Sequence, residues 1–544
     1  MSVAGAAPWW KTAVFYQIYP RSFALGDPAG RRARLATTGA AFDAARDGVG
    51  DLEGIRQKLD HLAWLGIDAI WISPFQPSPM ADFGYDVADF CDVDPLFGTL
   101  ADFDRLLGDA HARGLRVIMD WVPNHTSDRH PWFVDSRSSR TAEHRDWYIW
   151  RDGTGEATPP NNWARAFVEG PAWTFDEATR QWYLHLFLAE QPDLNWSNPA
   201  VVEAMSGVLR FWLDRGVDGF RIDVVLGLGK DPALPDVPAE LASLPYCDQN
   251  DDPSTHAILR QLRKVVDGYD QQPVAVGEVF LPTTEQILAY YGDNDELHLA
   301  FNFPPMECGF DASCMRSQTE EATRLFAQRV AWPTWVLSNH DRPRHRTRYG
   351  GSERRARAAA VLLLGWRGTA FLYAGEELGL EDAEIPRHAQ VDPGGRDGCR
   401  APIPWQPAPG YGWGLEGGPA WLPWPPRADL VNAETLSEDP SSILHLYRRL
   451  LAARRASAAL QLGDLELAAA PDSVVAFRRE WAGDVRVVVV GFGGDECAVD
   501  LDPPPEGTWI VEVASGGRDG LASEGERYLG RIGPEEALIL KPGP

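Results

Sequence analysis

The chain has 544 residues, too many for one hydrophobic core, so two or three domains are expected. Hydrophobic residues make up 44% of the chain and charged residues 24%, as in soluble globular proteins. The formal net charge of −27 at pH 7 repels phosphate groups, which disfavours nucleic acids and anionic membranes as partners.

The cysteines and the N-terminus bear on the compartment. The six cysteines are scattered, with no CxxC pair and no metal-ligand spacing, which predicts reduced thiols in a cytoplasmic protein. The first residues, MSVAGAAPWWKTAVFYQ, lack the basic start and long apolar core of a signal peptide. The apolar run at residues 358–366 is far short of the ~20 residues that span a bilayer.

Short apolar strands alternate with helical patterns along most of the chain. The first strand is followed by residues 24–50, which show no periodicity, and then by a helix that Asp51 caps. Thr99 opens the next helix, and Asn198 caps a later one that begins at Pro199. The expected strands are residues 14–19, 67–72 and 115–119, a fourth strand that ends at Asp223, and residues 274–278, 297–303, 334–337 and 369–373.

Eight strand–helix units predict an α/β fold, a (β/α)₈ TIM barrel. A doubly wound sheet is the alternative, but no GxGxxG turn follows the first strand. The last part of the chain alternates with period two at residues 474–477, 485–490, 509–513 and 537–540, which favours an antiparallel β-sandwich. The predicted domains are a barrel at 1–123 and 193–456 with an insertion at 380–439, a small inserted domain at 124–192 after strand three, and the C-terminal sandwich at 457–544.

Polar side chains follow the predicted strand ends, where barrel enzymes carry their active sites. They are Tyr85 and Asp86 after strand two, Asp120, Asn124 and His125 after strand three, Arg221 and Asp223 in strand four, Glu278 in strand five, and Asn339, His340 and Asp341 after strand seven. Arg221 and Asp223 alternate onto one side of their strand, where the arginine lowers the pKa of the acid and keeps it ionised. Alone they would equally suit a structural ion pair, but five polar ends together favour a site. Three convergent carboxylates suit glycosidic bond cleavage.

These motifs resemble the α-amylase family of glycoside hydrolases (family 13), and within it the α-glucosidase/oligo-1,6-glucosidase group. The motifs are DWVPNH at residues 120–125, GFRIDV at 219–224, GEV at 277–279, SNHD at 338–341 and QPDLN at 191–195. The resemblance spans nearly the whole chain, including the insertion after strand three and the C-terminal domain.

The resemblance implies roles for individual residues. The catalytic residues are Asp223 as nucleophile, Glu278 as general acid/base with a pKa raised by burial and by acidic neighbours, and Asp341, which fixes sugar hydroxyls. The substrate-binding residues are Arg221, His125, His340, Tyr85, Phe167 and Gln191, together with Asp86 and Arg400, which are expected to close the far end of the pocket. No cofactor is required for this chemistry.

The resemblance also bears on two further features, a structural metal ion and the type of glycosidic bond that is cleaved. Relatives often bind Ca²⁺ or Mg²⁺ in the first βα loop, where the matching positions here are Asp43, Asp47, the Val49 carbonyl and Asp51, with Ala45 in place of an oxygen ligand. Val after the nucleophile accompanies α-1,6 activity in relatives, but after Val224 the LGLGKDP loop differs from theirs, so the linkage stays open.

Three functions remain in competition. The first is an exo-acting retaining α-glucosidase that releases terminal glucose from short oligosaccharides or glucosides, with some transglucosylation. The second is a transglucosylase, or a sucrose- or trehalose-acting enzyme, with the same site. The third is a catalytically inactive amylase-like subunit, which is disfavoured because all three acids are present. The expected partner is a small oligosaccharide or glucoside, and the protein is expected to be a monomer or a homo-oligomer.

Overall fold

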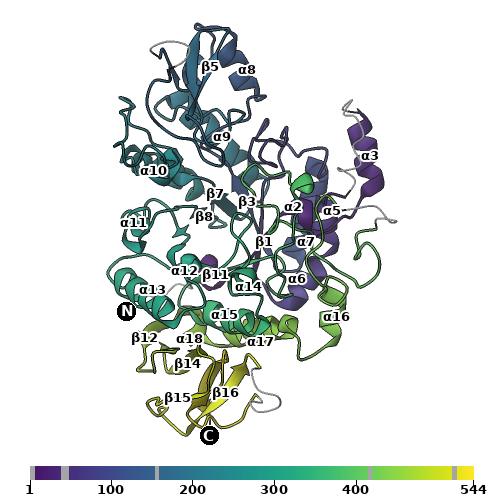
Figure 1. The fold of residues 1–544 in the computed structure, drawn as a ribbon, viewed down its shortest axis with the longest axis vertical. Helices are drawn as coiled ribbons and strands as arrows, with labels where there is room; N and C mark the ends of the chain where they lie inside the picture. Colours follow the sequence, from purple (N-terminus) through teal and green to yellow (C-terminus); the bar gives the residue numbers. More distant parts are fainter. Residues whose placement is uncertain (1–6, 38–47, 154–157, 415–419, 517–523, 544) are drawn as a thin grey trace.

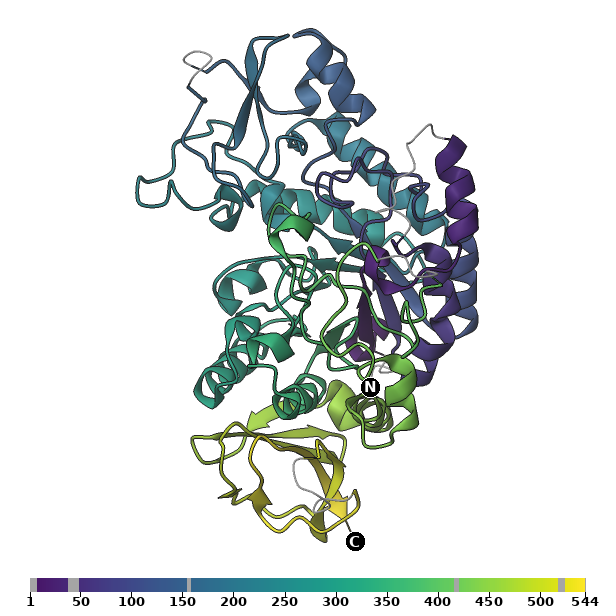
Figure 2. The same ribbon diagram turned by 45° about the vertical axis from the view of Figure 1, so that its right-hand side comes forward.

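The computed structural model describes residues 7–37, 48–153, 158–414, 420–516 and 524–543. The barrel occupies the middle of the molecule in Figure 1, with the inserted segment above it and the C-terminal sheet domain below it. Figure 2 shows the same arrangement after a 45° turn. Within the described ranges, no helix combines the length and apolar character needed to cross a bilayer.

Eight parallel strands form the barrel, which confirms the predicted fold. They are β1 (Val14–Ile18), β2 (Ala69–Ile72), β3 (Arg116–Trp121), β7 (Gly219–Ile222), β8 (Val274–Gly277), β9 (Leu299–Ala300), β10 (Thr334–Val336) and β11 (Thr369–Tyr373). They are hydrogen-bonded in the order β10-β11-β1-β2-β3-β7-β8-β9. The backbone N–H of Asn302 donates to the carbonyl of Thr334 at 3.0 Å, and this bond links the two ends of the sheet.

Helices follow the strands and surround the barrel. The longer barrel helices are α5 (Leu52–Gln57), α6 (Leu59–Leu65), α7 (Leu100–Ala112), α9 (Pro199–Asp214), α10 (Ser254–Val266), α11 (Thr284–Ala289), α13 (Ala312–Phe326), α15 (Glu353–Gly365) and α17 (Ile443–Ala456). Shorter helices are α1 (Trp9–Thr12), α2 (Pro20–Phe23), α12 (Pro304–Glu307), α14 (His345–Arg348), α16 (Ala433–Glu438) and α18 (Ala458–Leu462). The predicted N-caps are confirmed: Asp51 caps α5, Thr99 forms a capping box on α7, and Asn198 caps α9 ahead of Pro199.

Alternation along the strands fills the barrel and positions the site above it. Phe15 and Ile118 point inward, where Phe15 stacks on Phe371 with ring centroids 4.4 Å apart. The interior is therefore a packed core and not a pore. Asp120 lies two residues beyond Ile118 on the same face of β3, and it pairs in register with Arg221 of β7. The period that buries the apolar side chains thus carries these two charges to the top of the interior.

The segment after β3 forms a small domain of its own. It contains α8 (Pro131–Ser138), η1 (Arg145–Trp147) and a three-stranded antiparallel sheet of β4 (Trp150–Arg151), β6 (Gln181–Leu184) and β5 (Trp173–Asp176). The loop after β7, with η2 (Val225–Gly227) and η3 (Tyr246–Asp248), packs against it, since the Trp163 and Tyr246 rings stack with centroids 3.5 Å apart. The boundaries 124–192 for this domain stay a prediction.

The C-terminal domain is a sandwich of two unequal antiparallel sheets. The large sheet has the order β12 (Asp464–Leu467), β13 (Val474–Trp481), β14 (Asp484–Gly491), β18 (Ala537–Gly543) and β16 (Thr508–Ala514). The small sheet pairs β15 (Cys497–Ala498) with β17 (Arg531–Ile532), and an apolar cluster lies between the sheets. The first strand of this domain begins at Asp464, after α18.

Two other expectations are corrected. Residues 24–50 are not all irregular, because Pro28–Thr37 form the helix α3, whose Ala- and Arg-rich sequence buries only Arg31 and so shows no apolar period. The six cysteines are not all thiols, because Cys308 and Cys314 form a disulfide between the end of α12 and the start of α13. A separation of six residues is not a CxxC spacing, but the turn between the two helices brings the Cα atoms to 5.9 Å. The predicted insertion at residues 380–439 contains the short 3₁₀ helix η4 (Arg387–Ala389).

Candidate active site

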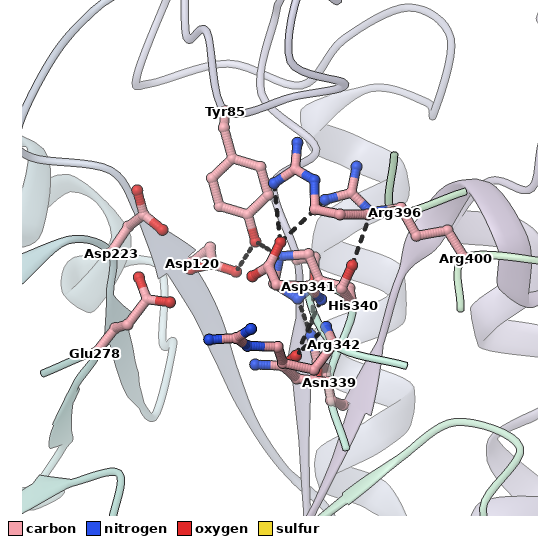
Figure 3. Close-up of polar contacts among 12 residues, drawn as sticks. Tyr85, Asp120, Asp223, Glu278, Asn339, His340, Asp341, Arg342, Arg396 and Arg400 are labelled. Atoms are coloured by element: carbon pink, nitrogen blue, oxygen red, sulfur yellow. Dashed lines mark hydrogen bonds and ion pairs between the residues drawn. The ribbon is translucent and has the colours of Figure 1, made fainter. Parts of the chain in front are cut away.

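One guanidinium is shared by three carboxylates at the ends of β3, β7 and β8. Arg221 donates to Asp120 Oδ1 at 2.6 Å and to Asp223 Oδ1 at 2.6 Å, and its second terminal nitrogen lies 2.9 Å from Glu278 Oε1. The Asp120 and Arg221 side chains are 0% and 1% exposed, whereas Asp223 and Glu278 are 7% and 18% exposed and face the opening. In Figure 3 these last two carboxylates lie side by side on the left of the site.

The electrostatics of this cluster differ from the prediction for Asp223. Burial raises the pKa of Asp223 well above its ordinary value, and the nearby Glu278 and Asp120 act in the same direction, while Arg221 opposes them. Burial likewise raises the pKa of Asp120 to about 6. The expectation that Arg221 keeps the pKa of Asp223 low is therefore wrong in its net direction, because it left out the loss of water around the pair.

Backbone geometry fixes the acid on β8. The amide of Val224 donates to Glu278 Oε2 at 3.0 Å, and the amide of Glu278 donates to the Ile222 carbonyl at 2.9 Å. Val224 has φ +43° and ψ +52°, a left-handed conformation that is rare for a β-branched residue. The strained turn directs the amide after Asp223 at the carboxylate of Glu278, which locks the two strand ends together.

A stacked pair of rings covers the other side of Asp120. The hydroxyl of Tyr85 lies 3.1 Å from Asp120 Oδ2 and 2.6 Å from His340 Nε2, and the two rings are parallel with centroids 5.3 Å apart. Burial lowers the pKa of His340 to about 3, so this imidazole is neutral at pH 7. The site thus joins residues predicted at strand ends two, three and seven.

Asp341 is surrounded by positive and polar groups. Its Oδ1 accepts from Arg396 at 2.9 Å and from Arg400 at 3.1 Å, and its Oδ2 lies 3.2 Å from His340 Nε2. Burial opposes ionisation of Asp341, yet its pKa is lowered below the ordinary value, first by His340 and then by the arginines. Since His340 is neutral at pH 7, the guanidinium groups hold Asp341 ionised there.

Arg396 is the centre of this half of the site, as Figure 3 shows, and the sequence did not reveal it. It donates to Asp82 at 2.6 Å, to Asp392 at 2.7 Å and to Asp341 at 2.9 Å, while its guanidinium carbon lies 4.2 Å from the centroid of the Phe167 ring. The signal was available, because Arg396 stands four residues before Arg400 in the run RDGCR.

The predicted pair of Asp86 with Arg400 is not formed, and the pair of Asp82 with Arg396 takes its place. The Asp86 carboxylate is buried and accepts from Ser78 Oγ at 2.8 Å and from the amides of Ala81 and Asp82 at 2.9 and 3.0 Å. It therefore holds the turn of the loop. Arg400 donates to Asp341 and to the His340 carbonyl, beneath the surface of the pocket.

The inserted domain contributes the remaining predicted residues. Gln191 donates to Asp82 at 3.1 Å and lies 3.0 Å from His125 Nε2, and burial lowers the pKa of His125 to about 4. Phe167 has φ +70° and is 37% exposed, with its ring 5.4 Å from that of Phe187. Phe167 thus lies at the mouth, where it contacts both its own domain and Arg396.

These residues line a cavity of about 340 Å³. Seven of the residues predicted for the site line it, namely Tyr85, His125, Phe167, Asp223, Glu278, His340 and Asp341. Arg221, Gln191 and Arg400 lie beneath the lining and Asp86 lies beside it. Lining residues that the sequence did not reveal include Asp82, Phe187, Asp248, Phe280, Arg342 and Arg396. The volume falls at the low end of the ~300–1,000 Å³ of small-molecule sites.

The predicted metal site falls partly outside the described residues. Asp43 and Asp47 are among the residues 38–47 that are not described, whereas Val49 and Asp51 are buried. The Val49 carbonyl accepts from Arg31, and the Asp51 carboxylate accepts from the amides of Gly26, Asp27 and Gly54. The two described oxygen groups thus already bond a guanidinium and backbone amides. No group of three or more metal-ligating side chains occurs in the described part of the chain.

Comparisons with known proteins place the chain among sugar-converting enzymes. The family model described as "Alpha amylase, catalytic domain" matches residues 17–463. A probable α-glucosidase of Rhizobium meliloti (strain 1021) is 41% identical over 523 residues, covering 90% of each chain. An oligo-1,6-glucosidase of Parageobacillus thermoglucosidasius is 34% identical over 531 residues, covering 89% of this chain and 90% of the relative.

Solved structures of similar proteins align with nearly the whole chain. The α-glucosyl transfer enzyme XgtA is 38% identical with a TM-score of 0.86, and the alignment covers 99% of this chain and 100% of that one. The trehalulose synthase MutB from Pseudomonas mesoacidophila MX-45 is 32% identical with a TM-score of 0.87 and the same coverage. A MutB mutant has also been crystallised with the substrate sucrose.

Proposed function

Because the chain belongs to the α-amylase family of glycoside hydrolases, we propose that it is an exo-acting α-glucosidase that retains the anomeric configuration. The observation that carries the proposal is the placement of Asp223 and Glu278 on adjacent strands, both facing one cavity and both bonded to Arg221. Two carboxylates at the reacting bond are the equipment of a retaining glycosidase.

The two steps follow from general chemistry. Protonated Glu278 donates its proton to the glycosidic oxygen as the bond to the anomeric carbon breaks, and Asp223 forms an ester with that carbon. Water then attacks the same carbon, Glu278 takes up its proton, and the ester bond to Asp223 breaks. Two inversions leave the product in the α configuration.

Asp341 and the surrounding groups are proposed to bind the terminal glucose. Asp341 is kept ionised by its arginines, so it accepts hydrogen bonds from two sugar hydroxyls, and these bonds strengthen as positive charge develops on the ring. His125 and His340 are neutral, so each can donate from one ring nitrogen. Tyr85 presents its ring as a stacking face for the sugar.

Exo action is proposed from the closed end of the cavity. Arg396 lies across the site from Asp223 and Glu278 in Figure 3, and its ion pair with Asp82 leaves no path for a chain past the terminal sugar there. The small volume supports short substrates.

A second reaction of the same site is a transfer of glucose to a sugar hydroxyl, or action on sucrose or trehalose. It is favoured by the similarity to XgtA, a glucosyl transfer enzyme, and to MutB, which was crystallised with sucrose. Both outcomes share the ester of Asp223 and differ only in what attacks it. An inactive binding subunit is disfavoured, because the three acids are present and aligned around one cavity.

The test is a product analysis on maltose, isomaltose, sucrose, trehalose and a chromogenic α-glucoside. The expected result is glucose released singly, with the α anomer appearing first by NMR. β-Glucose as the first product, or rapid internal cleavage of soluble starch, would contradict the proposal. Disaccharide or isomer products in excess of free glucose would assign the chain to the transfer reaction instead.

The remaining expectations are proposed in the same terms. The substrate is a small oligosaccharide or glucoside, the protein is a monomer or homo-oligomer in the cytoplasm, and catalysis needs no cofactor. Size-exclusion chromatography with light scattering tests the oligomeric state. A structural Ca²⁺ or Mg²⁺ in the first βα loop is disfavoured, because the Val49 carbonyl accepts a hydrogen bond from Arg31.

A further inference from the structure

A buried arginine lies where the first βα loop was expected to hold a metal. Arg31 belongs to α3, which stands at the right-hand edge of the barrel in Figures 1 and 2. Although it is one of three arginines in the first turns of that helix, its side chain is 0% exposed, whereas the neighbouring Arg32 is exposed. Leu35 packs against the core and Arg34 donates to the Pro95 carbonyl at 3.1 Å, but Arg31 is the one side chain of this helix that is fully buried among the described residues.

The contact is with the oxygens that a cation would use. The Arg31 guanidinium donates to the carbonyl of Val49. Asp51 accepts three backbone hydrogen bonds of 2.7–3.0 Å, which fix its carboxylate as the N-cap of α5. Ca²⁺ needs about six to eight oxygen ligands and Mg²⁺ six, all free to face the ion. The Val49 carbonyl already has a cationic donor, and most of the acceptor sites of Asp51 are taken by backbone amides.

The charge itself argues against a metal at the same place. A divalent ion bound to the Val49 carbonyl would lie beside the guanidinium that already bonds to this oxygen. Like charges at that distance in a buried site repel strongly. The arginine and the ion are thus alternatives for one position, and the arginine is part of the chain.

Hydrogen bonds connect the first βα loop to the residues beneath the substrate pocket. The amide of Gly50 donates to the Arg21 carbonyl at 2.7 Å, so the Val49 segment is tied to α2. In α2, the hydroxyl of Ser22 donates to the carbonyl of Arg400, whose side chain bonds Asp341. Val49 is therefore connected to the arginine beneath the substrate pocket through one backbone hydrogen bond and one hydrogen bond from the Ser22 side chain.

We propose that Arg31 is a built-in cation that replaces the divalent metal of the first βα loop. The positive charge is then always present, and no free ion has to bind to the folded state. Metal binding stabilises a fold by mass action and chelators reverse it, but a tethered guanidinium responds to neither. The inference concerns stability and does not depend on the proposed function.

The test measures thermal unfolding and metal content of the full chain. The purified wild-type protein is expected to contain Ca²⁺ and Mg²⁺ far below one ion per chain by ICP mass spectrometry, and its Tm is expected to stay within 1 °C in EDTA or in added Ca²⁺ or Mg²⁺. One tightly held ion per chain, or a Tm that falls in EDTA and recovers with metal, would overturn the proposal.

A matched pair of variants isolates the residue. Arg31→Ala should lower Tm by about 5 °C, because a buried donor and charge are lost. Arg32→Ala removes the same charge from the exposed neighbour and should lower Tm by less than Arg31→Ala does. Equal Tm values for Arg31→Ala and wild type would refute the role of Arg31. If Arg31→Ala does not fold, Arg31→Lys keeps the charge and should fold with a smaller loss of Tm, and failure of Arg31→Lys to fold would overturn the proposal.

Discussion

Replacing Arg396 by methionine tests the half of the site that the sequence did not reveal. Methionine has a similar length and no charge, so the change removes the ion pairs with little loss of volume. Arg396 is 9% exposed, and its partners Asp82 and Asp392 are 4% and 0% exposed, so solvent screens these pairs little. Removing one partner of a buried ion pair costs about 3–5 kcal/mol.

The cost is not spread evenly over the three carboxylates. Arg400 still lies 3.1 Å from Asp341 and 3.3 Å from Asp392, so these two retain a cation. Among the described residues, Asp82 keeps only the side-chain amide of Gln191 as a side-chain donor, and burial already raises the pKa of Asp82. We therefore expect a stability loss near the low end, about 3 kcal/mol, mostly from Asp82.

Activity should fall for a separate reason. Asp341 loses one of the groups that hold it ionised and in position, which should lower kcat/KM about 100-fold, or about 2.7 kcal/mol of transition-state stabilisation. Its folded-state pKa lies below the ordinary value, so its ionised form contributes stability above that value and loses it as pH falls. Without Arg396 the pKa of Asp341 rises, and the acid limb of kcat/KM should move toward neutral pH.

The assay is kcat/KM on a chromogenic α-glucoside across the acid limb, together with Tm. Arg387→Met is the matched control, since Arg387 is an exposed arginine in the same insertion. A variant at position 396 with kcat/KM within about threefold of wild type and an unmoved acid limb would refute the reasoning. A fall in Tm with an unmoved pH profile would make Arg396 structural only.

Three further changes probe the carboxylates. Asp223→Ala and Glu278→Gln should each reduce turnover by several orders of magnitude with Tm close to wild type, and near-normal activity in either would remove its assignment. Asp120→Asn removes a negative charge that raises the pKa of Asp223, so the acid limb of kcat/KM should shift to lower pH, and a shift upward would contradict the cluster described here. Asp82→Asn should act mainly on kcat/KM, because Asp82 lines the cavity. Asp86→Asn should act mainly on Tm, because the Asp86 carboxylate bonds the amides of its own loop and does not line the cavity.

The strands and the acids at their ends could be predicted because both depend on short-range pattern. The alternation that buries Phe15 and Ile118 also carries Asp120 and Arg221 to the interior rim, and a period of two is visible in the sequence. Helix α3 could not be found in this way, because its Ala- and Arg-rich sequence has no apolar face and only Arg31 is buried.

The pairing of Asp82 with Arg396 was missed for a different reason. Three positions separate Asp82 from Tyr85 and four separate Arg396 from Arg400, so the right loops were chosen and the wrong acid was taken from the first. The bond joins residues 314 positions apart, and only tertiary structure decides which acid of a loop turns into the cavity. The Asp86 carboxylate accepts hydrogen bonds from the amides of its own turn, as short polar side chains often do, and so does not face the cavity.

The failed prediction for Asp223 explains how the site could carry its proton. One guanidinium faces three carboxylates, so the cluster of Arg221, Asp120, Asp223 and Glu278 has a net charge of −2 when every acid is ionised. In a buried site that charge is costly, and the cluster lowers it by retaining a proton at pH values where free carboxyls have lost theirs. The proton belongs to the group and not to one residue. Glu278 is the most exposed of the three acids and faces the cavity, and Arg221 bonds both Glu278 and Asp223. The same burial that overrides the arginine thus keeps a proton within the group of carboxylates that borders the cavity.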